Sequence, residues 1–308
     1  MQRLRLRDVR VFLTVSELGS MGKAAAQLSV SQPAVSKSIA GMEDTLGVPL
    51  LDRTPQGVEP TIYGRALLKW ANTVLDDLRQ GVREIEFLAD PTAGEVSIGT
   101  TEMMAAGVVP AVVHRLSRQY PRMTFNVLQA RTLPLQYRDL RNRNVDLVLG
   151  RIPGPVEDDD LNVEILFDDP IFVVAGATHK WVRRRKIDAA ELINEAWCMP
   201  ANGGIVMTHI AQAFRAKGLE IPKHTVGSTS IQLFMALIAT GNFLSTSSGS
   251  TLRFSGKRLG MKALPVDLPI RSGPVGIITL KGRTLSPVAQ RFIGCAREVA
   301  RSLARRAE

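Results

Sequence analysis

The chain has few cysteines and no long apolar segment, and each shortage excludes a class of protein. Its 308 residues include two cysteines, Cys198 and Cys295, far apart in apolar stretches. We expect both to be buried, reduced thiols, because free cysteine is among the most often buried residues. A redox pair is the alternative, but nothing in the sequence brings the two together. No segment has the pattern of an export signal or the length of a membrane span, so we expect a cytoplasmic protein without a membrane partner.

The sequence signatures of enzymes are missing as well. The four histidines show no metal-ligand spacing, so we predict no metal site. A P-loop, a GxGxxG motif and a recognisable pair of nucleophile and base are all absent from the sequence. We therefore predict a protein that is not an enzyme and has no cofactor.

Positive charge is in excess but unevenly distributed. The formal net charge is +10, yet residues 1–90 carry 11 basic and 11 acidic residues, whereas residues 251–308 carry 12 basic and 3 acidic ones. A basic balance suits a nucleic-acid partner, although here most of the excess lies in the C-terminal part. Residues 1–70 hold a smaller local excess, nine cations against six anions, which a dimer would double.

Two short helices are predicted near the N-terminus. The second begins after Ser31, which is a good N-cap, and Pro33 suits its first turn, where a missing N–H costs little. Its apolar residues follow a helical spacing: Val35, Ile39, Met42 and Leu46. The first helix begins after Ser20, and its alanines at 24 and 25 allow a close crossing with the second. This arrangement is typical of a helix-turn-helix, whose second helix enters the DNA major groove.

The outer face of the second helix is short and polar, which suits contact with base edges and phosphates. On this face we predict the DNA contacts Ser31, Gln32, Pro33, Ser36 and Lys37. A solvated alanine-rich helix pair is the alternative. After this helix, LGVPLL and VEPT are predicted strands around the turn TPQG, which together form a small wing. Arg53 and Gln56 would lie on its rim, within reach of phosphates or the minor groove.

The run from FLTVSELGS to EPTIYG resembles the N-terminal domain of LysR-type transcriptional regulators. The shared features are the AA-L-SQPAVS core, the following I-x-x-M-E, the LG-x-PLL-x-R and the T-x-x-G-x-x-x-T, all before Gly64. Leu51 differs from the Phe that is usual in this family. The resemblance implies an α/β protein with an N-terminal winged helix-turn-helix, a long linker helix and a C-terminal two-subdomain α/β effector-binding domain.

Residues 62–89 are predicted to form one helix of roughly 25 residues, about 40 Å long. Its apolar residues recur every three or four positions: Leu67, Ala71, Val74, Leu78, Ile85 and Leu88. A small winged domain cannot cover such a helix alone, so a second copy of it is the simplest partner. Trp70 fits either that contact or the winged domain. A dimer would bring two reading helices to the half-sites of a palindrome.

Beyond Glu95, strand-like and helix-like segments alternate, which predicts a parallel sheet covered by helices. Residues 103–119 are expected to be helical, with Pro110 breaking an apolar run. By the resemblance, this part holds two subdomains joined by two crossovers, like a periplasmic binding protein. The predicted domains are 1–61 (winged helix-turn-helix), 62–89 (dimerisation linker helix), 90–93 (hinge) and 94–308 (effector-binding), with subdomain one at 94–165 and 266–308 and subdomain two at 166–265.

Ligands of open α/β sheets bind beyond the carboxyl ends of the strands, and this rule selects polar residues that follow the predicted strands. They are Thr100, Thr101, Arg131, Thr132 and Arg151 in subdomain one, and Asn202, Gly203, Thr229, Thr246 and Ser247 in subdomain two. Hydroxyls and free N–H groups at helix starts suit an anion, and the arginines could add charge-assisted bonds. A single Ser or Thr is more often a plain N-cap, so the prediction depends on their convergence on one cleft.

Together these features predict a sequence-specific, DNA-binding transcriptional regulator. A small effector, either an organic or aromatic acid or a sugar, would modulate its promoter binding. The partners implied are double-stranded DNA at an interrupted palindrome, further copies of the chain as a homodimer and homotetramer, and RNA polymerase. One alternative, an α/β enzyme or solute-binding protein with an incidental N-terminal domain, lacks catalytic motifs and an export signal. Another, an architectural DNA binder, does not need a large cleft-bearing domain.

Overall fold

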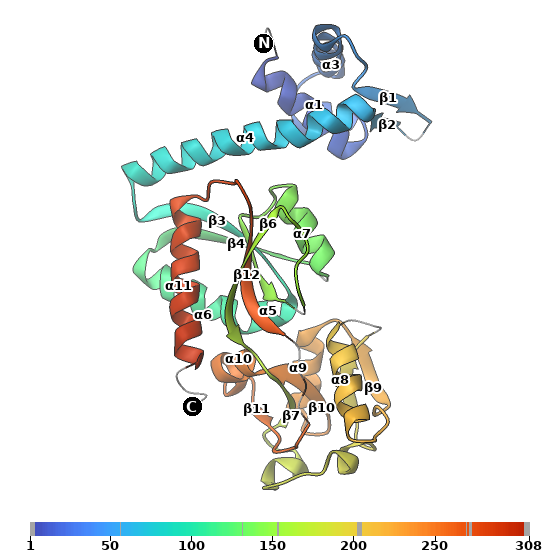
Figure 1. Cartoon of the computed structure of the whole chain (residues 1–308), viewed down its shortest axis with the longest axis vertical. Helices are drawn as coiled ribbons and strands as arrows, with labels where there is room; N and C mark the ends of the chain where they lie inside the picture. Colours follow the sequence, from blue (N-terminus) through green and yellow to red (C-terminus); the bar gives the residue numbers. More distant parts are fainter. Residues whose placement is uncertain are drawn as a thin grey trace. The chain divides into compact units, whose positions relative to one another are not determined.

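The computed structural model describes residues 4–55, 57–130, 132–152, 154–201, 205–268, 270 and 273–304. The chain divides into two compact units, Met1–Ile85 and Glu86–Glu308 (Figure 1). No helix within these described ranges is long and apolar enough to cross a membrane.

The first unit has the predicted order of three helices, a two-stranded wing and a long helix. Its elements are α1 (Leu6–Leu18), α2 (Met21–Gln27), α3 (Gln32–Leu46), β1 (Leu51–Thr54), β2 (Gly57–Pro60) and α4 (Ile62–Ala89), the last of which continues into the second unit. Helices α1 to α3 enclose one apolar core around Phe12, Val35 and Ile39, and Ala71 of α4 joins the same core. The predicted helix over 62–89 is confirmed, with 28 residues.

Two glycines allow the wing and α4 to pack this closely. Gly57 has a φ of +140°, and a Cβ there would lie 2.3 Å from the carbonyl oxygen of Gly19 at the end of α1. Gly64, in the first turn of α4, would bring a Cβ to 2.1 Å from the carbonyl oxygen of Leu50. Any side chain at either position would therefore push the wing or α4 away from the helical core.

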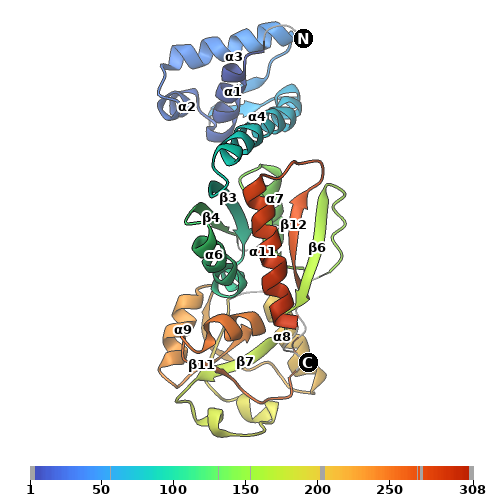
Figure 2. The same cartoon turned by 90° about the vertical axis from the view of Figure 1, so that its left-hand side faces the viewer.

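The second unit begins with a five-stranded sheet in the order β4-β3-β5-β12-β6. Strands β4 and β5 run parallel to β3, whereas β12 runs antiparallel to both β5 and β6. Helices α6 and α11 lie side by side over one face (Figure 2), and α7 packs with the apolar residues of the other. The elements are β3 (Ala93–Thr100), α5 (Glu102–Ala106), α6 (Val108–Gln119), β4 (Arg122–Gln129), α7 (Leu133–Arg141), β5 (Leu147–Arg151), β6 (Leu161–Asp168), β12 (Pro274–Leu280) and α11 (Pro287–Ala304).

A second five-stranded sheet has the order β11-β7-β10-β8-β9. Strand β8 is parallel to β9 and β10, and β7 is antiparallel to β10 and β11. The chain crosses between the two sheets after Asp168 and again after Ala263. The elements are β7 (Ile171–Gly176), the 3₁₀ turns η1 (Lys180–Arg183) and η2 (Ala189–Leu192), β8 (Trp197–Pro200), α8 (Ile205–Ala216), β9 (His224–Ser228), α9 (Ile231–Ala239), β10 (Leu244–Ser248), α10 (Gly249–Thr251), the π-helical turn η3 (Leu252–Gly256) and β11 (Met261–Ala263).

The helix predicted over residues 103–119 is divided into two. It breaks at Gly107, and Pro110 lies inside the first turn of α6. A Cβ on Gly107 would lie 2.9 Å from the Thr251 hydroxyl oxygen, so this glycine lets α5 pack against the segment after β10. The strands β6 and β11 were not predicted, and the segment AAELINE, whose sequence predicts a helix, forms the 3₁₀ turn η2.

Both cysteines are buried free thiols, as predicted. Cys198 lies on β8 of the second sheet, and Cys295 lies on α11 within the core of the first. Burial raises the pKa of Cys198 to about 11 and also raises the pKa of Cys295. Each thiol therefore stays protonated and unreactive near neutral pH.

Candidate DNA-reading helix and effector cleft

Helix α3 buries an apolar stripe and presents a polar face on the other side. Ser31 caps the helix by accepting the Ala34 N–H at 3.3 Å, as predicted. Val35, Ile39 and Met42 are at most 2% exposed. Gln32, Pro33 and Lys37 are exposed and Ser36 is half-buried, so this face is open to another molecule. Leu46 is 40% exposed, and its predicted burial is wrong because the core ends one turn earlier.

The preceding helix α2 packs against α3 through small side chains. Ser20 caps α2 by accepting the Lys23 N–H at 3.3 Å, which the sequence predicts. Ala24 and Ala25 are 0% and 5% exposed within the core shared with α3. The two caps and the alanines fix α3 against α2, so that the polar face of α3 has one orientation in this unit.

The wing is attached to α3 by a carboxylate. Glu43, near the end of α3, accepts the N–H groups of Leu50 at 2.7 Å and Leu51 at 3.2 Å, which fixes the entry into β1. Arg53 lies on β1 opposite Val58 of β2. Its side chain is not described, and Gln56 lies outside the described residues. The predicted wing contacts to DNA therefore stay a prediction.

Helix α4 has a second apolar face that nothing in the first unit covers. Its residues follow a spacing of three or four and are between 48% and 73% exposed: Trp70, Val74, Leu78, Val82, Ile85 and Leu88. Leu67 and Ala71, by contrast, pack into the helical core. Trp70 is 65% exposed and so does not pack against the winged domain, which was one of its two predicted positions.

In the effector unit, the threonines at the end of β3 have local partners. The Thr100 side chain is fully buried and donates to the carbonyl oxygen of Leu149 at 2.8 Å. Thr101 caps α5 by accepting the Met104 N–H at 3.4 Å. Thr132 precedes α7, is exposed and makes no cap bond. Thr132 is therefore the least constrained of the three, and Arg131 lies outside the described residues.

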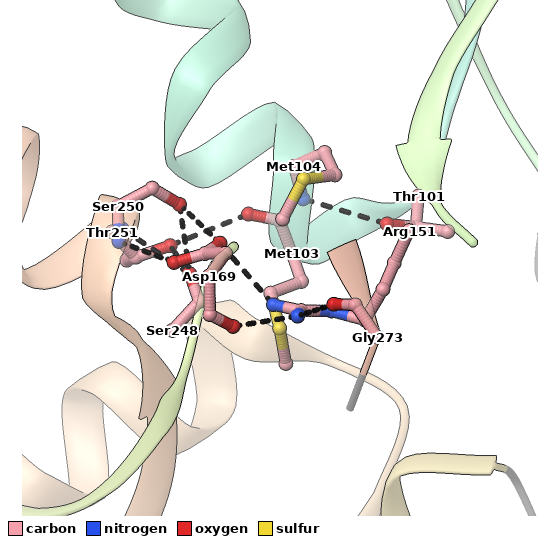
Figure 3. A network of polar contacts seen from close by, with 9 residues as sticks. All are labelled: Thr101, Met103, Met104, Arg151, Asp169, Ser248, Ser250, Thr251 and Gly273. Carbon is pink, nitrogen blue, oxygen red and sulfur yellow. Dashed lines mark hydrogen bonds and ion pairs between the residues drawn. The ribbon is translucent and has the colours of Figure 1, made fainter. Parts of the chain in front are cut away.

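Arg151, at the end of β5, is buried in a polar network at the crossover between the sheets (Figure 3). Its guanidinium donates to the carbonyl oxygens of Asp169 at 2.6 Å and Gly273 at 2.8 Å, and to the Asp169 carboxylate at 3.2 Å. That carboxylate also accepts the backbone N–H and the hydroxyl of Ser250, at 2.8 and 2.7 Å. Burial lowers the pKa of Arg151, and the Asp169 charge opposes this shift. The network joins both crossovers to the second sheet, which gives Arg151 a structural role in addition to its predicted contact with a ligand.

The predicted residues of the second sheet surround the end of β10 and the start of α9. Thr246 is half-buried and Ser247 is buried on β10, while Thr229 is exposed between β9 and α9. Asn202 and Gly203, predicted before α8, lie outside the described residues. The described members thus lie near strand and helix ends of the second sheet.

A contact across the two sheets comes instead from Glu102, which the rule of strand ends selects together with Thr100 and Thr101. Its carboxylate accepts the N–H of Ile231, the first residue of α9, at 2.9 Å. Two further bonds join α5 to the segment after β10: the Thr251 hydroxyl donates to the Met103 carbonyl oxygen, and the Ser255 hydroxyl donates to that of Ala106. Glu102 lies two residues after the end of β3, where the rule of strand ends places it. Asp169 had no such signal, because β6 was not predicted.

His209, on α8, adds an unpaired polar atom to this region. Its Nδ1 is buried and has no hydrogen-bond partner among the described residues. Burial lowers the pKa of His209, and the positive charge of Arg151 lowers it further. A neutral imidazole in this position can exchange one hydrogen bond with a polar ligand.

A cavity of about 600 Å³ lies beside the crossovers. Its walls are mainly apolar and include Phe172 and Leu268, and Asp168 and Asp267 add carboxylates. None of the predicted effector residues lines it. Within the described part of the chain, no group of three or more His, Cys, Asp or Glu side chains is arranged to hold a metal ion.

Comparison with known proteins finds two family models along the chain. Residues 6–65 match the bacterial regulatory helix-turn-helix protein, lysR family, and residues 89–301 match the LysR substrate binding domain. A curated relative, the HTH-type transcriptional regulator GbpR of Azospirillum brasilense, is 29% identical over 306 residues, covering 99% of this chain and 89% of the relative.

Solved structures share the fold over nearly the whole chain. A full-length OxyR variant from Pseudomonas aeruginosa has a TM-score of 0.66 at 22% identity and covers 98% of this chain and 96% of its own. CbnR, a LysR family transcriptional regulator, has a TM-score of 0.65 at 20% identity and covers 96% of this chain and 99% of its own. Both confirm the predicted fold class.

Proposed function

Because the chain belongs to the LysR family of transcriptional regulators, we propose that α3 reads a promoter and that a small molecule in the second unit adjusts this binding. The protein is a DNA-binding transcriptional regulator with a substrate-binding domain, and its family consists of regulators rather than enzymes. The promoter sequence, the contact residues and the class of effector are parts of the proposal.

The DNA-reading assignment is carried by one observation, the exposed polar face of a tightly fixed α3. Gln32 is the residue type that pairs with adenine, Lys37 suits a guanine edge or a phosphate, and Ser36 suits either kind of contact. Ser31 and Pro33 begin the helix, whose N-terminal end approaches the bases in this motif. Arg53 and Gln56 would add contacts from the wing. Selection of bound duplexes from a random library by the full-length protein, followed by footprinting, tests this assignment.

The uncovered face of α4 supports a homodimer. Six apolar side chains along one stripe lose contact with water if a second α4 packs against them. A dimer would bring two copies of α3 to the half-sites of an interrupted palindrome, and pairing of two dimers would form a homotetramer. Contact with RNA polymerase in the cytoplasm, where promoter DNA is transcribed, completes the proposed set of partners. The domain limits 1–61, 62–89, 90–93 and 94–308 belong to the same proposal.

For the effector, we favour a small organic or aromatic acid, with a sugar as the alternative. Thr101, Thr132, Thr246 and the N–H groups at the start of α9 offer hydrogen bonds to a carboxylate or a hydroxyl. Glu102 competes for the Ile231 N–H, so an acid at that position must displace the Glu102 carboxylate. A sugar hydroxyl could instead donate to Glu102. Thermal-shift measurements on the full chain with matched acids and sugars would separate these two classes.

A further inference from the structure

Two segments of the second unit carry a concentration of cations that DNA reading by α3 does not use. Residues 177–187 contain five basic residues, residues 257–265 contain three, and neither segment contains an Asp or a Glu. These eight residues form what we call the basic surface: Lys180, Arg183, Arg184, Arg185, Lys186, Lys257, Arg258 and Lys262. The first 90 residues, which contain the reading helix, have no net charge.

Hydrogen bonds bring the two segments together at both ends. The Ala177 N–H donates to the Gly260 carbonyl oxygen at 2.9 Å, and the Ile187 N–H donates to that of Pro265 at 3.1 Å. Between these points, residues 177–187 run beside the segment that contains β11 and its Lys262. Figures 1 and 2 both show the segment that follows β7 below β7 and β11, at the end of the second sheet.

The cations of the basic surface are open to solvent and mostly without acidic partners. All eight are exposed. Lys180 pairs with Glu195 at 2.6 Å, and the charge of Lys186 contributes to the lowered pKa of Asp267, after the larger effect of Lys217; no other member has an ion pair among the described residues. Lys180 and Arg184 also lie 5.6 and 5.7 Å from the ring centre of Trp181, which is 9% exposed and holds both cations close together. So many unneutralised like charges repel one another unless a polyanion binds.

The composition of the surface favours a polyanion over a protein or a membrane. A protein interface has an apolar or aromatic centre, and a membrane-binding face adds exposed aromatic or aliphatic anchors. Among the described residues, none of the exposed large hydrophobic side chains belongs to residues 177–187 or 257–265. Duplex DNA has one phosphate charge per about 1.7 Å, and lysine and arginine bind it without an apolar contact.

We propose that the basic surface binds the phosphate backbone of duplex DNA outside the bases that α3 reads. This second contact is independent of sequence. It adds counterion release to a chain whose first 90 residues have no net charge, and it gives a function to three cations of the C-terminal excess together with the cluster at residues 180–186. A contact of this kind raises affinity for selected and unrelated DNA alike, so α3 still sets the discrimination between them.

The test compares two full-length variants with the same change in charge. One changes the surface: Arg183→Gln, Arg184→Gln, Arg185→Gln and Lys186→Gln. The matched control changes four exposed cations scattered over the same unit: Arg118→Gln, Arg138→Gln, Lys223→Gln and Arg301→Gln. Binding is titrated between about 50 and 200 mM salt, on a duplex selected by the wild-type protein and on a scrambled duplex of equal length, since the salt slope counts the phosphates contacted.

We expect the surface variant to bind both duplexes about tenfold or more weakly and to lower the salt slope by about 2 to 4, near 0.9 per lost phosphate contact. The control should change the slope by less than about 1. A second variant, Lys257→Gln with Arg258→Gln and Lys262→Gln, should lower the slope in the same direction. Unchanged circular dichroism and melting temperature would show that the variants are folded.

Equal slopes for the surface variant and the control would overturn the proposal. The proposal would also be overturned if the surface variant bound both duplexes like the wild type but no longer bound anionic lipid vesicles or polyglutamate. The partner would then be a membrane or an acidic protein. The proposed reading by α3 fails separately, if the wild-type protein does not distinguish the selected duplex from the scrambled one.

Discussion

Glu102 and Ile231 join the two sheets of the effector unit through one charge-assisted hydrogen bond. The Glu102 carboxylate follows β3, and the Ile231 N–H at 2.9 Å belongs to the first turn of α9. Because the N-terminus of a helix carries partial positive charge, the carboxylate is well placed there. Ser230 caps the same turn from within its own segment, by accepting the Leu233 N–H at 3.2 Å.

Glu102→Ala should therefore loosen the start of α9 and the neighbouring α5 together. Loss of a bond to a charged group costs about 1.5–3 kcal/mol, so local opening should rise roughly ten- to hundredfold. Hydrogen exchange of the amides in α5 and at the start of α9 measures this. Ser230→Ala is the control and should affect α9 alone. Exchange in Glu102→Ala that matches the wild type would mean that the bond does not hold the two sheets together.

On α3, Gln32→Ala and Ser36→Ala should each reduce sequence discrimination by about 1–3 kcal/mol, because a base edge loses its partner. Stability should change by less than about 0.5 kcal/mol, since neither side chain belongs to the core. Thr45→Ala, at the far end of the same helix, is the control. Quantitative footprinting on a selected duplex measures the effect. The assignment of α3 as the reading helix is wrong if both variants footprint like the wild type.

On α4, Leu78→Asp should weaken self-association by more than about tenfold, because it places a charge within the apolar stripe of a dimer. Leu78 is 51% exposed in the single chain, so the folding of the winged domain should be preserved. Arg79→Asp places the same carboxylate one residue away and should dimerise normally. Sedimentation of the full-length proteins decides. Identical dimerisation by both variants would exclude this stripe as the interface.

In the effector unit, Thr132→Val should reduce effector affinity about 5- to 150-fold, or about 1–3 kcal/mol, if its hydroxyl binds the ligand. Its side chain makes no cap bond, so stability should stay constant. Thr101→Val should reduce affinity by a similar factor and also cost about 0.5–2 kcal/mol of stability, because it removes the cap of α5. Calorimetric titration with the effector found by thermal shift would test both. Unchanged affinity in both variants would remove these threonines from the site.

Stability should fall below pH 6.5 because of His179. Its Nδ1 accepts the Trp181 N–H at 3.3 Å, so the imidazole must be neutral. Burial is the main cause of the lowered pKa of His179; Glu195 raises this pKa by a smaller amount, and Lys180 lowers it. A lowered folded pKa means that the unfolded chain binds the proton more readily. The stability is therefore complete above the unfolded pKa, about 6.5, and decreases as pH falls through the folded pKa.

His179→Asn keeps a cap acceptor without a titratable ring, so it should flatten the pH dependence of unfolding between pH 7.5 and 5.5. His209 has a lowered pKa as well, and its substitution in addition to His179→Asn should flatten the curve further. Urea unfolding at several pH values measures both. A slope in His179→Asn as steep as in the wild type would contradict this account.

Local signals in the sequence were sufficient for much of the fold. Caps at Ser20 and Ser31, the stripe over Val35 to Met42 and the long helix from residue 62 all depend on neighbours within a few residues. Strand β6 was missed although its first five residues, LNVEI, alternate between apolar and polar types. The break at Gly107 was missed because its cause, Thr251, lies far away in the chain.

The sequence by itself determined the family, the helix-turn-helix and the surplus of cations, since each is encoded in spacing or composition. Only the tertiary structure decided which polar residues have partners. Arg151 meets Asp169 across the crossover, Glu102 meets Ile231 across the two sheets, and the basic segments around Arg184 and Arg258 meet beside β11. The physical reason is the same in each case. A buried or bridging polar group is fixed by partners that are distant in sequence, and such pairs form only when the sheets and their crossovers have folded.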